Sequence, residues 1–266
     1  MLKAIGFALV WFGGLMIIPF AAYTADAGCA HSGPQTPRDI ANKAGSNAAY
    51  FSPAPSADKL NLCNIHFHKN AEHKGPQFGL SGGQGKYGGW KCNAEIQSQQ
   101  KADALAPITV PEHGCTNVQP GDTVEVHWVF SSCNVKPGAG LKSCVSNECA
   151  NPQVRVEAAV FLLVNDDQAI DFSPFDYHAN DAQSYQQPMQ LPDATGAVEF
   201  LGSTTGPNYT EQSCSPYQVT WNVRPQCRAL NINTLHKWCQ QNVFEEHDAH
   251  GVRQLVTDVK LLAPIR

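Results

Sequence analysis

Ten cysteines constrain the possible folds of this 266-residue chain more than any other feature of its sequence. All of them lie after residue 28, and their number is even. In a protein exported to an oxidising compartment, such a set predicts disulfides that hold distant parts of the chain together. No pair is spaced as C-x-x-C, so a zinc ribbon or a thioredoxin-like site is not expected. The sequence does not give the pairing of Cys29, Cys63, Cys92, Cys115, Cys133, Cys144, Cys149, Cys214, Cys227 and Cys239.

The N-terminal segment has the pattern of a secretory signal peptide. A short basic start precedes the apolar residues 4–22, and residues 25–27 form a small-x-small cleavage site. The apolar run is also long enough for an uncleaved membrane anchor, but Pro19 and the small residues after it favour cleavage. We therefore expect residues 1–27 to be removed, and residues 28–266 to form one exported domain that is periplasmic or secreted.

The charge of the chain is mildly negative, with 18 basic and 23 acidic residues and no basic run. Nucleic acids and anionic membrane surfaces are therefore poor candidates for partners. A small neutral substrate needs no electrostatic steering, so the composition is compatible with one.

Five segments have the composition of β-strands, with β-branched and aromatic residues between turn-like residues. The longest is almost continuously apolar and predicts a central strand, although its periodicity fits a buried helix as well. The five segments are residues 62–68, 123–130, 154–164, 197–201 and 217–223.

Helix signals are sparse. The best helix candidate is residues 233–240, with Asn233 or Thr234 as its cap. The glycine-rich residues 79–89 are expected to form a loop, and residues 28–59 to wrap the surface. The pattern predicts a mainly β (α+β) fold, with a single domain around a central, mostly antiparallel sheet and short peripheral helices.

Residues 64–73 read Asn-Ile-His-Phe-His-Lys-Asn-Ala-Glu-His, and their first part predicts a strand. Residues two apart in a strand point to the same face, so His66 and His68 project side by side. Ile65 and Phe67 then face the core on the other side. Two imidazoles placed in this way can hold one metal ion, and zinc is the default choice.

A second strand supplies a candidate third ligand. In residues 123–130, Glu125, His127 and Val129 share one face. Glu125 precedes His127 by two residues, as Asn64 precedes His66, and such a polar side chain can accept the free ring N–H of a metal-bound histidine. Three nitrogen ligands leave a fourth tetrahedral position for water, as in catalytic zinc sites.

These motifs resemble the active-site core of α-type carbonic anhydrases. The spacing H-x-H-x-x-x-E-H runs from His66 to His73, and Glu125-x-His127 follows. Residues 202–207 are similar to the family's S-L-T-T-P-P loop. The segment after it also matches, with Cys214, Val219-Thr220-Trp221 and, more weakly, Gly251-Val252-Arg253.

The chain between His68 and His127 is longer than in the α class. The whole is most similar to the δ class of carbonic anhydrases, in separated blocks from about Leu62 to Trp221. The resemblance also implies that Cys214 ties the active-site loop to an N-terminal segment through Cys29 or Cys63.

The resemblance implies an alpha-carbonic-anhydrase-like fold and a zinc-dependent lyase. Such an enzyme converts carbon dioxide reversibly to bicarbonate and a proton through zinc-bound hydroxide. His66, His68 and His127 would hold Zn2+. Thr204 would donate a hydrogen bond to Glu72 and orient the hydroxide. Val129 and Thr205 would line the substrate pocket. As alternatives, Thr204 is an ordinary turn residue and Val129 a core residue.

A rival hypothesis is an exported, disulfide-framed metal-binding or interaction protein without turnover. The pair of Thr204 and Glu72 discriminates between the two, since a metal buffer has no use for an orienting pair. The group that carries the proton away is not identified, and His31, His113 and His178 are candidates. Residues 247–250 contain two further histidines, and we expect a solvated acidic surface there.

Overall fold

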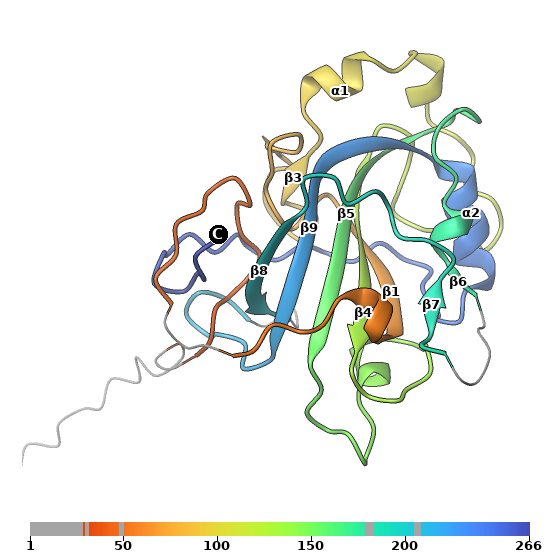
Figure 1. Cartoon of the computed structure of the whole chain (residues 1–266). Coiled ribbons are helices and arrows are strands. Elements are labelled where there is room, and N and C mark those ends of the chain that lie inside the picture. Colours follow the sequence, from red (N-terminus) through yellow and green to blue (C-terminus); the bar gives the residue numbers. More distant parts are fainter. Residues whose placement is uncertain (1–28, 30–31, 48–50, 179–183, 205–208) are drawn as a thin grey trace, which may run out of the picture.

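The computed structural model describes residues 29, 32–47, 51–178, 184–204 and 209–266 (Figure 1). The expected signal peptide at residues 1–27 lies outside this part of the chain, as do His31 and Thr205. None of the helices in the described part has the length and apolar character that a membrane crossing requires.

A five-stranded sheet forms the centre of the molecule, in the order β1-β4-β5-β9-β8 (Figure 1). Neighbouring strands are antiparallel except β5 and β9, which run parallel. The prediction of a mainly β fold around a mostly antiparallel sheet is therefore confirmed. The strands are β1 (Asn61–Lys69), β4 (Thr123–Ser131), β5 (Val154–Val164), β8 (Val198–Ser203) and β9 (Gln218–Asn231).

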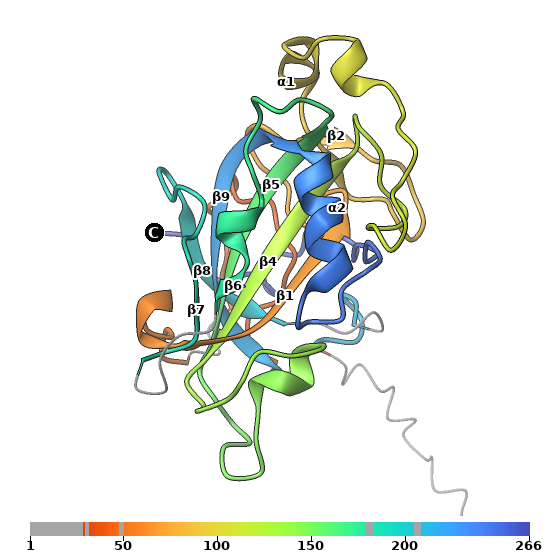
Figure 2. The same ribbon diagram turned by 90° about the vertical axis from the view of Figure 1, so that its right-hand side faces the viewer.

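Both faces of the sheet are covered, which explains why β4 is buried along its whole length. On one face, Ile65 and Trp128 pack in a core that α2 (Ile232–Gln241) covers with Trp238 (Figure 2). On the other face, Val129 and Trp221 belong to a second buried cluster. Side chains alternate between these faces along each strand, so the histidines lie on the face opposite α2.

The remaining elements are short. They are η1 (Ala57–Lys59), β2 (Leu80–Ser81), β3 (Trp90–Lys91), α1 (Ala94–Ser98), η2 (Asp103–Leu105), η3 (Leu141–Cys144), η4 (Ser173–Phe175), β6 (Tyr177–His178) and β7 (Gln187–Pro188).

Two predicted boundaries are wrong. Strand β9 continues past residue 223 to Asn231 although it contains Pro225, because three residues of β9 face the single residue Ala159 of β5 there. A proline fits such a bulge, since the bulge leaves residues out of the hydrogen-bond ladder. The predicted helix cap at Asn233 or Thr234 is also wrong. Helix α2 is capped by Asn231, whose side chain accepts a hydrogen bond from the backbone N–H of Asn233.

The glycine-rich residues 79–89 also differ from a pure loop, because Leu80–Ser81 pairs with Trp90–Lys91 as a short hairpin. The expectation that residues 28–59 wrap the surface is wrong for their middle part. Residues 35–38 are buried, and Ile40 belongs to the core cluster beside the histidine face. Backbone carbonyls accept the hydrogen bonds of the buried Arg38 guanidinium, which makes its burial possible.

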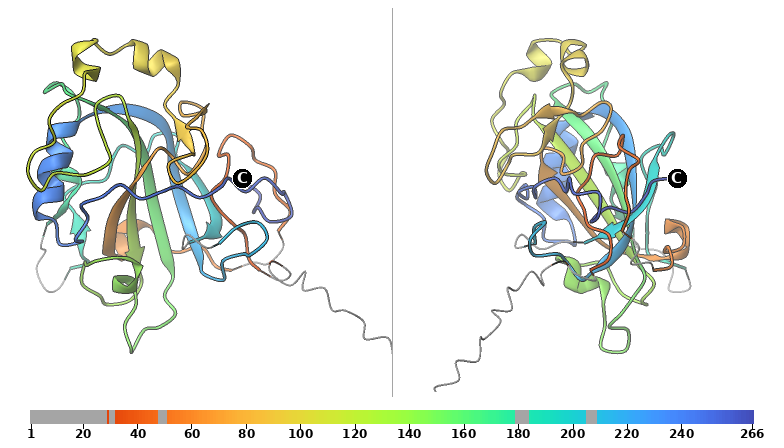
Figure 3. Two further views of the ribbon diagram at one scale, coloured as in Figure 1. Left: turned by 180° about the vertical axis from the view of Figure 1, so that it is seen from behind. Right: turned by 90° about the vertical axis from the view of Figure 1, so that its left-hand side faces the viewer.

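Seen from behind, the segment after α2 crosses the sheet toward the β8 end, where it lies beside the N-terminal segment (Figure 3). Backbone hydrogen bonds join the two, from Gln35 to Leu261 and from Val256 to Pro37. The C-terminal segment therefore covers the face that carries the histidines.

All ten cysteines are paired. Cys214 pairs with Cys29, which is one of the two partners that the resemblance implied. The five disulfides are Cys29–Cys214, Cys63–Cys144, Cys92–Cys227, Cys115–Cys239 and Cys133–Cys149. Such a set is typical of proteins from an oxidising, extracytoplasmic compartment.

Removing the disulfide between Cys92 and Cys227 by alanine substitution of both should lower the free energy of unfolding by about 2–5 kcal/mol, measured with urea. The sequence separation is 135 for this pair and 16 for Cys133–Cys149. Because the entropy that a crosslink removes from the unfolded chain grows with loop length, the same change at Cys133 and Cys149 is the control and should cost less. A larger loss for the short loop would contradict this account.

Candidate metal centre

The register between β1 and β4 brings the three predicted histidines together. His66 lies directly opposite His127, and His68 lies opposite Glu125. One ring nitrogen from each of His66, His68 and His127 can be chosen so that all three lie within 4.8 Å of one another. The sequence-based grouping of these side chains therefore matches the geometry, while their role as ligands stays a prediction.

The outer ring nitrogens of His66 and His68 are held by protein acceptors. Nδ1 of His66 lies 2.7 Å from Oδ1 of Asn64, and Nδ1 of His68 lies 2.9 Å from the carbonyl oxygen of Gly251. A neutral ring that donates from Nδ1 keeps its lone pair on Nε2. Nε2 of His68 is buried and has no hydrogen-bond partner, which is the condition expected of a nitrogen that awaits a metal ion.

The third ring is oriented the other way. Nδ1 of His127 lies 3.2 Å from Nε2 of His66, so Nδ1 is the inward nitrogen. Its Nε2 lies 3.5 Å from Oε1 of Glu125, which is longer than a well-formed hydrogen bond. The acceptor that the sequence predicted for His127 is thus in place but at a longer distance than Asn64 from His66.

Glu125 has a second task that sequence reasoning missed. Its Oε1 lies 2.9 Å from Nδ1 of His73, and its Oε2 accepts hydrogen bonds from the backbone N–H groups of Glu72, at 2.6 Å, and His73, at 3.2 Å. This fully buried carboxylate therefore fixes the turn after β1 as well as facing His127.

Electrostatics favours the uncharged form of His66 and His68. Burial, with repulsion from His127, lowers the pKa of His66 well below its usual value. Burial also lowers the pKa of His68 to about 4, against the opposing attraction of Glu72. At neutral pH both rings are therefore neutral, and only a neutral imidazole offers a lone pair to a metal ion.

Glu72 and Thr204 lie on the same cavity. Oε1 of Glu72 accepts a hydrogen bond of 3.0 Å from the backbone N–H of Arg253, while its buried Oε2 has no hydrogen-bond partner. Burial alone would raise the pKa of Glu72, but His68 and Arg253 outweigh it and lower the pKa to about 2. The contacts of the described residues do not include a bond from Thr204 to Glu72, so that bond stays a prediction.

The cavity has a volume of about 780 Å³ and is lined by both polar and apolar residues. Val129 lines it and also belongs to the second buried cluster, so its role in a substrate pocket stays a prediction, whereas Thr205 falls outside the described residues. The apolar side chains beside the histidines are Val129, Leu141, Val156 and Trp221.

His247 and His250 are exposed, as the prediction of a solvated surface requires, but His250 also lines the cavity that holds the three histidines. Its ring is stacked 5.4 Å from that of His66, and its backbone N–H donates to the carbonyl of Phe67 at the edge of β1. A hydrogen bond to Glu246, opposed by burial, raises the pKa of His250. Neither His113 nor His178, the two relay candidates in the described part of the chain, lines this cavity. His250, which was not among the candidates, does line it.

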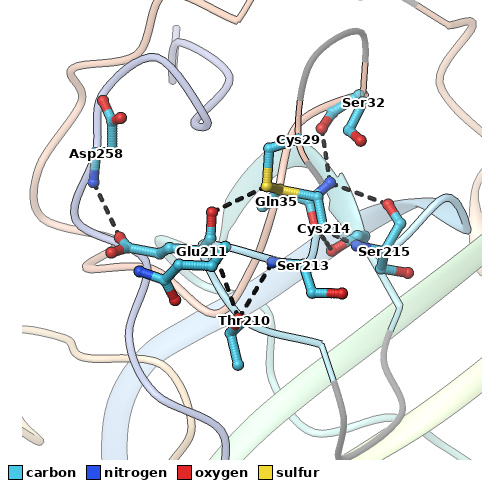
Figure 4. Close-up of a disulfide and its surroundings, with 12 residues drawn as sticks. Cys29, Ser32, Gln35, Thr210, Glu211, Ser213, Cys214, Ser215 and Asp258 are labelled. Carbon is cyan, nitrogen blue, oxygen red and sulfur yellow. Dashed lines mark hydrogen bonds between the residues drawn. A yellow bond between two sulfur atoms is a disulfide. The ribbon is translucent and has the colours of Figure 1, made fainter. Parts of the chain in front are cut away.

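Residues 210–215, which precede β9, lie beside the N-terminal segment and are bonded to it (Figure 4). Cys29 is bonded to Cys214, and Oε1 of Gln35 accepts a hydrogen bond of 2.9 Å from the backbone N–H of Ser215. Ser203, just before Thr204, also donates to this oxygen at 3.3 Å. Gln35 therefore holds both sides of the loop that carries Thr204.

The donor set fits zinc. Three imidazoles from two neighbouring strands converge, and three nitrogen ligands would leave one tetrahedral position open. Sequence reasoning missed the carbonyl of Gly251, because a backbone acceptor from a distant segment leaves no side-chain signal.

Replacing Asn64 by Leu should weaken zinc binding about 10- to 100-fold, because outer hydrogen-bond partners orient ligand rings. Competition with a chelator of known affinity measures this loss. The matched control is Asn61→Leu on the same strand, whose amide donates to the carbonyl of Cys133 far from the ligands. Equal zinc affinity in both variants would show that Asn64 does not hold His66 for the metal.

Comparison with known proteins gives a family match. The model of the delta carbonic anhydrase family matches residues 57–234, which include the three histidines, Glu72 and Thr204. No curated protein matches the sequence.

Two solved structures are similar at low sequence identity. The α-carbonic anhydrase from Thermovibrio ammonificans, in complex with the inhibitor sulfanilamide, is 13% identical, with 84% of each chain covered and a TM-score of 0.33. The α-carbonic anhydrase from Photobacterium profundum is 13% identical, with 87% of this chain and 90% of that chain covered and a TM-score of 0.32. Both TM-scores are low, so the family assignment depends on the family match.

Proposed function

This chain belongs to the delta carbonic anhydrase family, and on that premise we propose that it is an exported zinc enzyme that converts carbon dioxide reversibly to bicarbonate and a proton. The observation that carries the proposal is the convergence of three ring nitrogens from His66, His68 and His127. The outer nitrogen of each ring faces an acceptor of the protein.

These three histidines would hold Zn2+. When bound there, zinc supplies a hydroxide nucleophile near neutral pH, because it lowers the pKa of a water molecule from about 15.7 to about 7. Asn64 and Gly251 keep the rings of His66 and His68 in the tautomer that presents Nε2. Glu125 faces the third ring and braces the turn that carries Glu72.

Thr204 and Glu72 would orient the nucleophile. An ionised carboxylate only accepts hydrogen bonds, so a threonine hydroxyl that faces Glu72 must donate to it. The oxygen of Thr204 is then left to accept the proton of the nucleophile, whose lone pair points toward the substrate. This is a positioning effect, which becomes large when the reacting atoms are held in line.

Carbon dioxide would lie against the apolar wall. Val129, Val156 and Trp221 present apolar surface beside the histidines, which suits a small molecule without charge. Thr205, next to Thr204 in the chain, would complete this pocket.

Export is supported by the five disulfides, which need an oxidising compartment to form. We therefore take residues 1–27 as a signal peptide that is removed, and residues 28–266 as the mature enzyme in the periplasm or outside the cell.

The alternative function is a metal-binding or interaction protein without turnover. It accounts for the histidines and the disulfides. It gives no reason for a buried carboxylate, Glu72, to keep one oxygen without a hydrogen bond in the cavity that Thr204 also lines.

The purified, zinc-loaded protein should hydrate carbon dioxide well above the rate of buffer in a stopped-flow pH-indicator assay. His127→Ala should abolish zinc binding. Thr204→Ala should keep zinc and lose about 100-fold in kcat, since misplacing a positioning group costs this much. Thr195→Ala, at an exposed turn before β8, is the control and should be fully active.

Absence of activity with zinc, cobalt and cadmium would contradict the proposed reaction. Full activity in both His127→Ala and Thr204→Ala would show that the site has been assigned to the wrong residues.

A further inference from the structure

Arg253 is a nearly buried arginine on the wall of the histidine cavity. Its side chain is 9% exposed, and burial lowers the pKa of its guanidinium, with Glu72 opposing that effect. A buried guanidinium is costly unless opposite charge and hydrogen bonds compensate it. The contacts of Arg253 therefore indicate which groups its buried guanidinium holds in place.

The first contact is with Glu72. Oε1 of this carboxylate accepts the backbone N–H of Arg253 at 3.0 Å and lies 3.6 Å from its Nε. Both contacts use the same oxygen, so Oε2 remains as the free acceptor of Glu72. Arg253 thus selects which carboxylate oxygen is available to another donor.

The second contact leads to the strand end before Thr204. Nη1 of Arg253 donates to the carbonyl oxygen of Thr36. The backbone N–H of Thr36 donates to Oγ of Ser203 at 3.3 Å, and its hydroxyl donates to the carbonyl of Ser203. Thr204 is the next residue, and its own N–H is fixed to the carbonyl of Tyr217 at 2.8 Å.

We infer that Arg253 is a positioning residue that sets the distance and direction between Thr204 and the free oxygen of Glu72. One guanidinium joins the acceptor, through Glu72, to the segment that holds the donor, through Thr36 and Ser203. This inference rests on the proposed function, because the pair of Thr204 and Glu72 has a task only in that reaction.

The geometry requires arginine in particular. Lysine carries one nitrogen at its tip and cannot span the carboxylate of Glu72 and the carbonyl of Thr36 in a fixed plane. Among the described residues, Arg253 is the only arginine or lysine that forms an ion pair with Glu72.

The decisive variant is Arg253→Met in the zinc-loaded protein. It should lower kcat about 10- to 100-fold with KM and zinc affinity nearly unchanged, as expected for lost positioning in the transition state. Arg253→Lys should not restore the rate. The matched control is Arg224→Met, which removes another buried arginine bonded to a carboxylate, Glu157, and a carbonyl, but one that does not line the cavity.

Double substitution separates positioning from a general effect on the fold. The double variant Thr204→Ala with Arg253→Met should have the kcat of Thr204→Ala alone, within about twofold, because both changes disrupt the same pairing of Thr204 with Glu72. If the two losses multiply, or if Arg253→Met is as active as the wild type, the inference is wrong. Should Arg253→Met fail to fold, Thr36→Val tests the same path, and an unchanged kcat would overturn the inference.

A readout without turnover keeps this test separate from that of the proposed function. In the zinc-loaded protein, the methyl NMR signal of Thr204 should shift in Arg253→Met and stay in place in Arg224→Met. An unshifted signal would contradict the inference even in an active enzyme. A zinc-loaded wild type without activity, together with a shifted signal, would overturn the proposed function while supporting the link from Arg253 to Thr204.

Discussion

The pairing of β1 with β4 is the constraint on which the rest of the site depends. Because His66 lies opposite His127, two neighbouring strands place three imidazoles on one face without any loop. A slip of one residue would turn all of these side chains toward the core under α2. The apolar residues that alternate with the histidines along these strands prevent such a slip, since Ile65, Phe67 and Trp128 are fully buried on the other face of the sheet. The hydrophobic core thus fixes the register that the candidate metal centre needs.

The second layer of the site comes from chain segments that are far apart in the sequence. The C-terminal segment crosses the histidine face and supplies the carbonyl of Gly251 and the buried Arg253. The N-terminal segment supplies Gln35 and Thr36, which hold the end of β8 and the loop after it. The disulfide of Cys29 with Cys214 and the contacts of the two terminal segments keep this layer in place. The two terminal segments therefore cover the histidine face and also contribute groups to the site.

The sequence predicts those parts of the structure that depend on the two-residue alternation of side chains along a strand. Alternation along residues 64–68 placed His66 and His68 on one face, and the same rule placed Glu125 with His127. It could not predict Gly251, because a backbone carbonyl has no side-chain signal. The predicted strand also ended too early, at residue 223, since the bulge that accommodates Pro225 depends on the partner strand. Likewise, the position of His250 beside His66 follows from long-range pairing with β1, which no local pattern encodes.

X-ray absorption at the zinc edge of the zinc-loaded protein tests the central claim most directly. Zinc bound by His66, His68 and His127 should show three imidazole nitrogens and one further light ligand at about 2.0–2.1 Å, with no sulfur at about 2.3 Å. One imidazole should be lost from any zinc that His127→Ala still binds. A sulfur shell, or an imidazole count that His127→Ala leaves unchanged, would contradict the assignment of the metal to these three histidines.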